Sequence, residues 1–343
     1  MDRMKACVLE DYGKVCIKDV PFRPPEEGQA LVKVRSVGIC GSDTKAFQKK
    51  GSPVSVPLVL GHEVAGVIVE LKPNGPCDLK EGDRVLLKPY IYCGVCYPCS
   101  LGRPNCCESL GVLGVQIGGA MSEYFSHPIK SLVKLSDELE WHIAPLAEPL
   151  AISLHALHRV NLCAGENALI IGAGPIGLMA AIVARHYGAL PILVDIVPAR
   201  LRLAESLGIL NTINPGQCDP FAETAKITRG RMAEVVVEAS GSERAIRQTL
   251  DYASYCGRVS LTGWPTGETS LPTAVITRKE LQIYGSRNSA NEFEEAIELI
   301  ENNVIDAETI ISEVVSFGDL PRMIELISEF PDRYIKVNAL LPD

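Results

Sequence analysis

The sequence lacks any concentration of positive charge. No run of lysine and arginine is longer than two residues, and the formal net charge at pH 7 is −9. Such a chain does not present the broad basic surface that attracts nucleic acids or anionic membranes. We therefore expect a small-molecule partner, and neither a nucleic-acid nor a membrane partner.

Long apolar runs are also missing. The N-terminal residues, MDRMKACVLEDYGKVC, contain no apolar segment of the kind found in signal peptides. The longest uncharged stretch, 168–184, is interrupted by three glycines and a proline and is shorter than the ~20 residues that cross a bilayer. We expect a cytoplasmic protein. In that reducing compartment its 12 cysteines favour metal or redox sites over disulfides.

The length and the local patterns predict two domains. The chain has 343 residues, and a single hydrophobic core rarely grows beyond about 250–300. Short β-type runs broken by glycine and proline continue to about Ala147, which predicts an irregular, barrel-like β domain. From Asn167, apolar β-branched segments alternate with amphipathic helical ones, which predicts an α/β domain with a parallel sheet. The tail from Asn291 leaves this alternation, and we expect it to rejoin the first domain.

A glycine-rich loop, GAGPIG, matches the pattern G-x-G-x-x-G between a predicted strand and a predicted helix. In such a loop Gly172 permits a tight turn, Gly174 admits a pyrophosphate, and Gly177 lets the helix pack closely on the strand. Pro175 and Ile176 stand at the helix N-terminus, where free N–H groups face the anion, and belong to the same predicted cofactor site.

Asp195 ends the strand that follows this helix. Its separation from the glycines is close to the ~20 residues typical of an acid that binds the adenosine ribose. A carboxylate accepts from the ribose hydroxyls and repels a 2′-phosphate, so NAD is favoured over NADP. A nearby arginine would still accommodate NADP.

Five cysteines fall within YCGVCYPCSLGRPNCC. Cys93, Cys96 and Cys99 repeat at C-x-x-C spacing, and a fourth ligand follows at Cys106 or Cys107. Four thiolates arranged tetrahedrally would close a structural zinc site. A redox C-x-x-C pair and an iron–sulfur loop are the alternatives, but the third thiol in phase and the fourth downstream favour zinc.

A second set of metal-ligand types is spread along the chain. GICGSD contains Cys40, LGHEVAG contains His62 and Glu63, and LAEPLA contains Glu148. A thiolate, an imidazole and carboxylates are the ligand types of a catalytic zinc that keeps one position for substrate. Taken singly, each residue also fits an ordinary role as a core thiol, a satisfied polar residue or a solvated acid.

Six motifs then occur in a fixed order: CGSD, GHEVAG, GDRV, CGVCYPCSLGRPNCC, EPLAISLHA and IGAGPIGLM. Together they resemble the zinc-containing medium-chain dehydrogenases/reductases over essentially the whole chain. EPLAISLHA and GSRNSANEF are similar to the polyol and sugar-acid branch, near sorbitol, galactitol-1-phosphate and L-galactonate dehydrogenases. The resemblance implies a GroES-like catalytic domain over 1–148 and 288–343, with a structural zinc lobe at about 90–108, and a Rossmann domain over 149–287. It also implies a homodimer or homotetramer.

The resemblance also implies roles for individual residues. It places a catalytic zinc on Cys40, His62, Glu63 and Glu148, and a structural zinc on Cys93, Cys96, Cys99 and Cys107. Ser42 matches the hydroxyl that passes on the substrate proton, and Arg200 matches a residue that contacts the adenosine ribose. Arg287 and Lys45 match positions near the substrate, and Lys45 replaces the histidine that ends many proton relays.

The expected activity is zinc-dependent hydride transfer between NAD and a secondary hydroxyl of a polyol or sugar acid. Lys45 and Arg287 would offer positive charge to a carboxylate, whereas we expect Lys49 and Lys50 to form a solvated loop. A sugar-alcohol phosphate is the alternative substrate. A non-catalytic NAD(H)-binding and zinc-binding sensor, or a zinc-free quinone-type reductase, is the alternative class, but neither needs the Cys40 and His62 pair.

The remaining cysteines and histidines carry no predicted chemistry. We expect core packing for five isolated cysteines, at positions 7, 16, 163, 218 and 256. His155 and His158 stand three apart on a predicted helix without an acid at matching spacing, so we expect packing or capping there.

Overall fold

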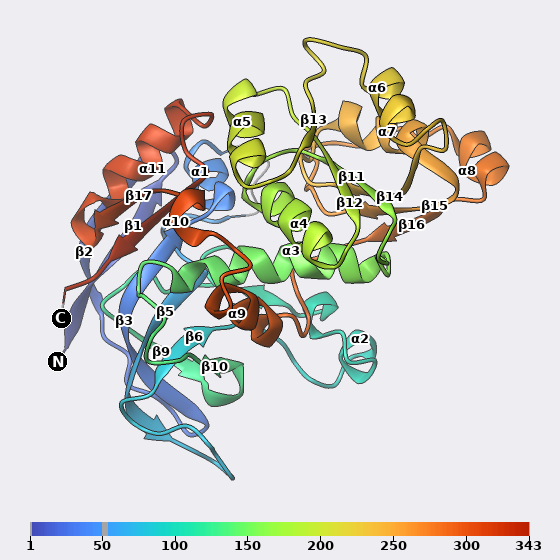
Figure 1. The fold of residues 1–343 in the computed structure, drawn as a ribbon. Coiled ribbons are helices and arrows are strands. Elements are labelled where there is room, and N and C mark those ends of the chain that lie inside the picture. Colours follow the sequence, from blue (N-terminus) through green and yellow to red (C-terminus); the bar gives the residue numbers. More distant parts are fainter. Residues whose placement is uncertain (1, 50–53, 343) are drawn as a thin grey trace. The chain divides into compact units, whose positions relative to one another are not determined.

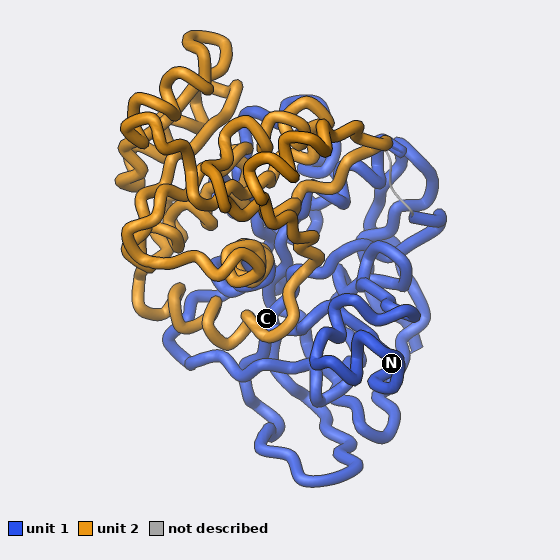
Figure 2. Tube along the Cα trace, turned by 90° about the vertical axis from the view of Figure 1, so that its right-hand side faces the viewer, with its two compact units in different colours: residues 1–148, 310–343 blue, residues 149–309 orange. Residues whose placement is uncertain are grey.

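The computed structural model describes residues 2–49 and 54–342, so Lys50 lies outside the described residues. The chain divides into two compact units, one of residues 1–148 and 310–343 and the other of residues 149–309 (Figures 1 and 2). Residues 288–309, which the sequence expectation assigned to the first domain, lie in the second unit. There Glu292 accepts a hydrogen bond from His155 of the same unit.

The first unit is rich in β-structure. Its strands are β1 (Arg3–Asp11), β2 (Lys14–Pro21), β3 (Gln29–Ile39), β4 (Leu58–Val59), β5 (Glu63–Lys72), β6 (Arg84–Leu87), β7 (Tyr90–Ile91), β8 (Gly111–Val112), β9 (Tyr124–Pro128), β10 (Leu132–Lys134), β17 (Ile311–Ser316) and β18 (Lys336–Leu340). Its helices are α1 (Gly41–Phe47), α2 (Tyr97–Ser100) and α11 (Leu320–Glu329), with short 3₁₀ turns at Pro104–Cys106, Ile129–Ser131, Ala144–Leu146 and Phe317–Asp319.

The long strand β3 organises this unit. It lies inside a sheet of order β10-β6-β5-β3-β18-β17, with β9 also paired to β3. The sequence of β3, QALVKVRSVGI, is mostly apolar and mostly buried, as a strand with neighbours on both sides requires. β18 pairs antiparallel with β3, so the C-terminal segment does return to the first unit. The β-rich class expected for this part is confirmed.

The second unit is a parallel sheet of order β13-β12-β11-β14-β15-β16, in which every neighbouring pair is parallel. Its strands are β11 (Asn167–Ile171), β12 (Leu190–Val194), β13 (Asn211–Ile213), β14 (Ala233–Glu238), β15 (Ala253–Leu261) and β16 (Gln282–Gly285). Its helices are α3 (Ala147–Arg159), which begins in the last residues of the first unit, α4 (Pro175–His186), α5 (Pro198–Ser206), α6 (Pro220–Ile227), α7 (Glu243–Tyr252), α8 (Thr273–Lys279), α9 (Phe293–Glu301) and α10 (Ala307–Ile310).

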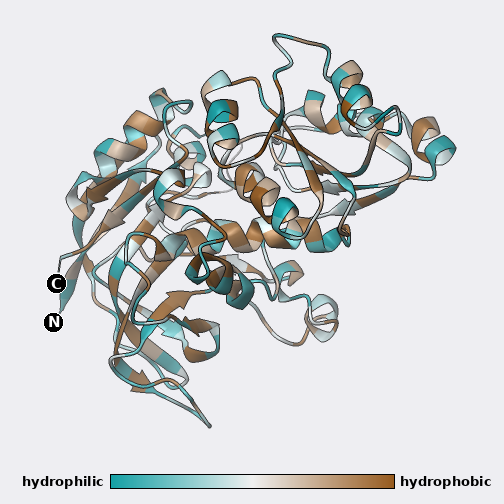
Figure 3. Cartoon of the chain, viewed as in Figure 1, coloured by the Kyte–Doolittle hydropathy of each residue, from teal (hydrophilic) through white to brown (hydrophobic). Residues whose placement is uncertain are grey.

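This strand order is that of the doubly wound Rossmann fold, in which β11 and β14 flank the point where the order reverses. All five residues of β11 are buried, and α4 buries a continuous run from Gly177 to Ala184, which Figure 3 shows largely in brown. The α/β Rossmann class predicted from the alternation is confirmed. Among the described residues no helix is long and apolar enough to cross a membrane.

Candidate functional site

The first candidate site lies where β3 ends and β5 begins. Cys40 follows β3 directly and is the N-cap residue of α1, while His62 immediately precedes β5 and Glu63 is its first residue. β3 and β5 pair antiparallel with Gly38 opposite Glu63, which brings the two ends together. As a result the ligand atoms of Cys40, His62 and Glu63 all lie within 4.8 Å of one another.

Gly38 provides the room for this arrangement. A Cβ atom at Gly38 would lie 2.0 Å from Oε2 of Glu63, far inside any van der Waals contact. A glycine at this position of β3 therefore lets the Glu63 carboxylate turn inward beneath the neighbouring strand. Any side chain there would displace it.

Several buried polar atoms at this point are unsatisfied. His62, Glu63 and Glu148 are only 5%, 1% and 2% exposed, yet Nδ1 of His62, Oε1 of Glu63 and Oε2 of Glu148 have no hydrogen-bond partner within residues 2–49 and 54–342. A buried polar atom without a partner costs about 1–3 kcal/mol. Nitrogen and oxygen atoms without protein partners, beside the Cys40 sulfur, fit a bound metal ion, and zinc takes sulfur, nitrogen and oxygen ligands.

Three charged neighbours set the electrostatics of the centre. Burial lowers the pKa of His62, but the neighbouring Cys40 thiolate and the Asp43 carboxylate outweigh it and raise that pKa well above its usual range. Burial, reinforced by Glu63, raises the pKa of Glu148 to about 7. Oγ of Ser42 is 3.3 Å from Nε2 of His62. Glu148, the fourth predicted ligand, lies outside the 4.8 Å group in the described part of the chain, and the Tyr90 hydroxyl donates to it over 3.3 Å.

Sequence reasoning missed two residues of this site. Lys336, at the start of β18, forms a fully buried ion pair with Glu63 and donates a second hydrogen bond to the carbonyl of Ile39 over 3.1 Å. Asp43 accepts a hydrogen bond of 2.8 Å from the Cys40 backbone N–H and so fixes the start of α1. A signal for Lys336 existed, because it is the one charged residue in the apolar strand KVNAL.

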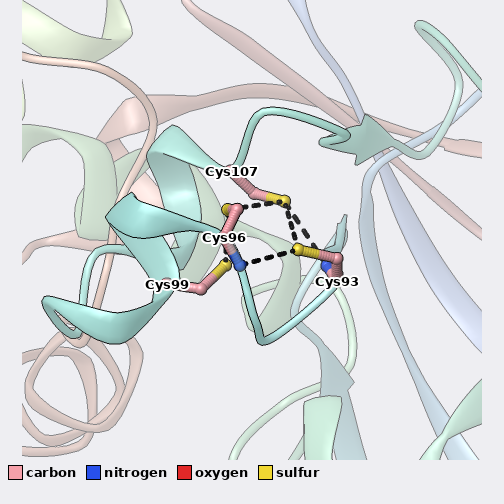
Figure 4. A group of neighbouring side chains, drawn as sticks. All are labelled: Cys93, Cys96, Cys99 and Cys107. Carbon is pink, nitrogen blue, oxygen red and sulfur yellow. Dashed lines mark hydrogen bonds between the residues drawn. The ribbon is translucent and has the colours of Figure 1, made fainter.

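The second candidate site is the cysteine lobe, which we define as residues 93–107. The sulfurs of Cys93, Cys96, Cys99 and Cys107 face one another (Figure 4). Three sulfur–sulfur distances are 3.4 Å for Cys96 to Cys99, 3.8 Å for Cys96 to Cys107 and 3.6 Å for Cys93 to Cys107. Four thiolates around zinc, each about 2.3 Å away, define a tetrahedron with edges of about 3.8 Å. The lobe therefore fits a zinc ion with little adjustment.

Backbone N–H groups support the thiolate form of Cys93, whereas burial raises the pKa of Cys99 to about 12. Cys93 Sγ accepts from the N–H groups of Val95 at 3.5 Å and Cys96 at 3.4 Å, and these hydrogen bonds lower the pKa of Cys93 to about 6. A deprotonated thiol is the form that binds metal. Cys106, the alternative fourth ligand, is outside this group among the described residues, and Cys107 is inside it.

The glycine-rich loop lies between β11 and α4 in the second unit. Gly172 has φ +102°, which is accessible only to glycine without strain, and a Cβ at Gly177 would lie 1.8 Å from the Gly172 carbonyl oxygen. By contrast, a Cβ at Gly174 would meet nothing within 4 Å, so this N-cap position of α4 faces open space. The three glycines thus show the turn, the open approach and the close packing expected of a pyrophosphate-binding loop.

Asp195 lies at the end of β12 and is buried. One of its carboxylate oxygens accepts from the Ala173 N–H at 2.6 Å and the other from the Val197 N–H at 2.8 Å. Nη1 of Arg200 lies 3.9 Å from the same carboxylate. The acid and the arginine expected at an adenosine ribose site are therefore adjacent.

Other predicted residues fall in separate places. Lys45 is exposed in the last turn of α1, and Lys49 places its Nζ 4.7 Å from the centre of the Tyr12 ring. Arg287 is exposed in the segment between β16 and α9.

Core packing holds for the buried Cys7, and Cys16 is partly buried. The prediction was wrong for Cys163, Cys218 and Cys256, which are exposed. His155 and His158 do have an acid partner, Glu292, which sequence spacing could not reveal because it comes from α9.

Family comparisons agree with this geometry. The family model described as alcohol dehydrogenase GroES-like domain matches residues 26–137, and the model described as zinc-binding dehydrogenase matches residues 175–302. The chain is 50% identical to a zinc-type alcohol dehydrogenase-like protein of Haemophilus influenzae, with 99% of each covered. It is 36% identical to L-galactonate-5-dehydrogenase of Escherichia coli, with 95% of each covered, and 31% identical to sorbitol dehydrogenase of Bacillus subtilis, with 97% of this chain and 96% of that protein covered.

Solved structures show the same likeness. An Escherichia coli alcohol dehydrogenase in complex with NADH has a TM-score of 0.92 at 30% identity, and a zinc-binding dehydrogenase of Sinorhizobium meliloti bound to NADP has 0.90 at 28%. Each comparison covers 99% of this chain and 100% of that one. Galactitol-1-phosphate dehydrogenase of Escherichia coli has a TM-score of 0.91 at 28% identity, with 98% and 100% covered.

A GroES-like unit with a sulfur, nitrogen and oxygen donor cluster, followed by a Rossmann unit, defines an alcohol dehydrogenase-type oxidoreductase. The chain belongs to the zinc-binding medium-chain dehydrogenase/reductase family, among relatives named as polyol and sugar-acid dehydrogenases.

Proposed function

We propose that this protein oxidises a secondary hydroxyl of a sugar acid or polyol with NAD as hydride acceptor, using one catalytic and one structural zinc ion. The observation that carries the proposal is the cluster of Cys40, His62 and Glu63, whose ligand atoms lie within 4.8 Å and include buried atoms without partners in the described part of the chain. A sensor that only binds NAD(H) has no need of such a buried donor cluster with a hydroxyl beside it.

The residues of the first unit would hold the two metal ions and accept the substrate proton. Cys40 and His62 would hold the catalytic metal, with Glu63 and Glu148 as carboxylate ligands, and Cys93, Cys96, Cys99 and Cys107 would hold the structural one. A bound zinc ion acts as a Lewis acid and lowers the pKa of an oxygen ligand from about 16 toward 7. The Ser42 hydroxyl, whose Oγ is 3.3 Å from Nε2 of His62, would accept the proton of the substrate hydroxyl.

The second unit would bind the dinucleotide through Gly172, Gly174, Pro175, Ile176 and Gly177. The free N–H groups at the start of α4 would face the pyrophosphate. Asp195 would accept from the adenosine ribose hydroxyls, with Arg200 beside it. A buried carboxylate repels a 2′-phosphate, which supports NAD over NADP.

The substrate class is supported by charge and by relatives. Relatives named L-galactonate-5-dehydrogenase and sorbitol dehydrogenase act on a sugar acid and a polyol by their names. Lys45 and Arg287 are exposed cations that would favour a carboxylate, so an aldonate is our first choice. The same charges would serve a phosphate, and the structural likeness to galactitol-1-phosphate dehydrogenase supports a sugar-alcohol phosphate as the second candidate.

A substrate panel tests the proposal. Production of NADH is measured at 340 nm with L-galactonate and related aldonates, with sorbitol and related polyols, and with their phosphates, each with NAD and with NADP. We expect the highest kcat/KM with an aldonate and NAD, and two zinc ions per chain by elemental analysis. Tight NADH binding without turnover on any member would favour the sensor, and absence of zinc would favour the quinone-type reductase. A particle mass from light scattering decides the proposed dimer or tetramer.

A further inference from the structure

A group of titratable side chains outside the metal centres lies within the second unit. His155 and His158 come from the C-terminal half of α3, and Glu292 is the N-cap residue of α9. Nδ1 of His155 is 2.8 Å, and Nδ1 of His158 is 3.4 Å, from the same oxygen, Oε1 of Glu292. We call these three residues the α3–α9 clamp. It is not a third metal centre, because only the two clusters above have ligand atoms within 4.8 Å in the described part of the chain.

A second layer of contacts holds the outer histidine. Nε2 of His158 is 3.2 Å from the hydroxyl of Tyr187, and the two rings are stacked with planes 10° apart. The same hydroxyl donates to Glu295 of α9, whose other carboxylate oxygen is 3.4 Å from His158. Both ring nitrogens of His158 are thereby fixed, one by the clamp and one by this outer pair.

The other carboxylate oxygen of Glu292 faces the chain that precedes α9. Oε2 accepts from the backbone N–H of Ala290 at 2.6 Å and of Asn291 at 2.9 Å. This side chain therefore closes the end of the segment 286–291, which we call the Arg287 segment. One carboxylate ties the segment to two histidines of α3.

The start of the Arg287 segment is tied to the same helix. Nε of Arg159, the last residue of α3, donates to the carbonyl of Gly285 over 3.0 Å, and the Ser286 N–H donates to Leu261 over 2.9 Å. Between the two ties, Ser289 is fully buried. The segment is therefore a short bridge, tied at its end to α3 through Glu292 and at its start to β15 through Ser286 and, through the preceding Gly285, to α3, with the exposed Arg287 between them.

The chemistry of the clamp points to a positioning role. Glu292 is buried, which raises its pKa, but hydrogen bonds from His155 and His158 outweigh this and hold that pKa well below its usual range. The carboxylate is thus a buried anion, and replacing such charged contacts by apolar packing is often neutral or stabilising. What a carboxylate adds over apolar packing is direction, because two histidines and two N–H groups must each meet it at hydrogen-bond geometry.

We propose that Glu292, with His155 and His158, is a positioning group that fixes the Arg287 segment and thereby the place of Arg287 toward the substrate carboxylate. The inference rests on the proposed function, in which Arg287 contacts an anionic substrate. Glu292 itself touches no substrate in this proposal.

The first half of the proposal is tested by hydrogen exchange on the zinc-loaded full chain. Glu292→Gln keeps an amide oxygen for the Ala290 and Asn291 N–H groups but removes the charge that gathers the histidines. We expect amide exchange in the Arg287 segment to rise roughly tenfold, while Glu298→Gln, an exposed acid of the same helix, leaves it unchanged. Equal exchange in the two variants would show that the clamp does not hold the segment. If Glu292→Gln fails to fold, His158→Gln, which alters only the half-exposed histidine, takes its place.

The second half is tested by a double-mutant cycle on KM for L-galactonate, or for the aldonate that the panel selects. We expect Arg287→Ala and Glu292→Gln each to raise KM roughly tenfold with kcat nearly unchanged, because both weaken a binding contact. In the Arg287→Ala background, Glu292→Gln should then add almost nothing, whereas a general structural defect would multiply the two effects. Independent effects would overturn the positioning role. An Arg287→Ala protein with unchanged KM would instead refute the substrate contact of the proposed function, whatever the exchange experiment shows.

Discussion

The cysteine lobe and the Cys40 centre use similar ligand atoms in opposite ways. All four sulfurs of the lobe come from one short loop, and Cys93 is exposed. The residues in and around the Cys40 centre come from the ends of elements that are distant in sequence: the end of β3, the start of β5, the first turn of α3 and the start of β18. Its imidazole and carboxylates are almost completely buried.

This difference shows how each region compensates the charge of its ligand atoms. In the lobe, the neighbouring backbone N–H groups of Val95 and Cys96 stabilise charge on the Cys93 sulfur, so that part of the compensation is local. The Cys40 centre buries charge, and it depends on compensation from a distant strand in the form of Lys336. A local, uniform and closed set of ligands suits a structural role. A mixed and buried set with the Ser42 hydroxyl beside it suits chemistry on a bound hydroxyl.

The largest expected effect separates the two regions by activity. Cys40→Ser and His62→Ala should each lower kcat roughly 10³-fold or more. A Lewis acid stabilises the transition state by several kcal/mol, and each 1.36 kcal/mol of activation free energy changes the rate about tenfold. NADH binding, followed by fluorescence, should persist because it depends on the second unit. Cys163→Ser, an exposed thiol, is the matched control and should keep full activity. Near-normal kcat in either centre variant would refute zinc catalysis at this site.

A second experiment tests whether the buried centre depends on its distant cation. Lys336→Met leaves the Glu63 carboxylate buried without its ion-pair partner, and breaking such a pair costs about 3–5 kcal/mol. Urea unfolding of the purified protein measures the loss. Lys5→Met breaks the 3.0 Å pair with Asp19, in which both side chains are 51% exposed, and should cost less than about 1 kcal/mol. Equal losses of unfolding free energy in the two variants would contradict a special dependence of the centre on the buried Lys336.

A third experiment addresses the lobe. Cys96→Ser should remove one zinc ion per chain and lower the free energy of unfolding by about 3 kcal/mol, on the scale of losing a cross-link from a short loop. The remaining folded protein should keep its kcat, in contrast to Cys40→Ser. Cys106→Ser, which changes the adjacent thiol outside the sulfur group, should alter neither zinc content nor stability. A Cys96→Ser protein with two zinc ions and an unchanged thermal midpoint would contradict a structural zinc here.

The same contrast explains how far the sequence could predict the molecule. The spacing of the cysteines predicts the lobe, because all of its predicted ligands lie within sixteen consecutive residues. The Rossmann unit is equally local: alternation predicts β11, α4 and β12, and three glycines with Asp195 predict the loop geometry. The separation of Cys40 from His62 carries no such information, and the resemblance to a family was needed to bring them together.

Contacts made only by tertiary structure escaped prediction. Lys336 pairs with a residue on a strand far away in sequence, and Glu292 reaches two histidines of α3 from the start of α9. No periodicity links such positions, so no pattern could pair them. Exposure was also misjudged for Cys163 and Cys218, because cysteine chemistry favours burial while loops place residues at the surface.

The smallest expected effect compares two buried imidazoles of the first unit. His62 lies among anions, whereas His127 has one ring nitrogen 2.9 Å from the Lys88 carbonyl, and burial lowers its pKa to about 4. The unfolded chain, with a pKa near 6.5, binds the proton more readily, so stability falls as pH drops from about 6.5 to 4 and is level outside that window. At pH 5 the penalty is about 2 kcal/mol. His127→Gln keeps a donor for the Lys88 carbonyl but cannot titrate.

Urea unfolding at pH 7 and pH 5 measures this difference directly. The wild-type protein should lose about 2 kcal/mol more than His127→Gln between the two pH values. His127 lies outside both ligand clusters, so the comparison isolates what burial alone does to an imidazole. If the two proteins lose the same stability, then burial is not what suppresses protonation at His127. His62 is also buried, but its charged neighbours raise its pKa. The difference between the pKa values of His127 and His62 would then need another explanation than burial opposed by charge.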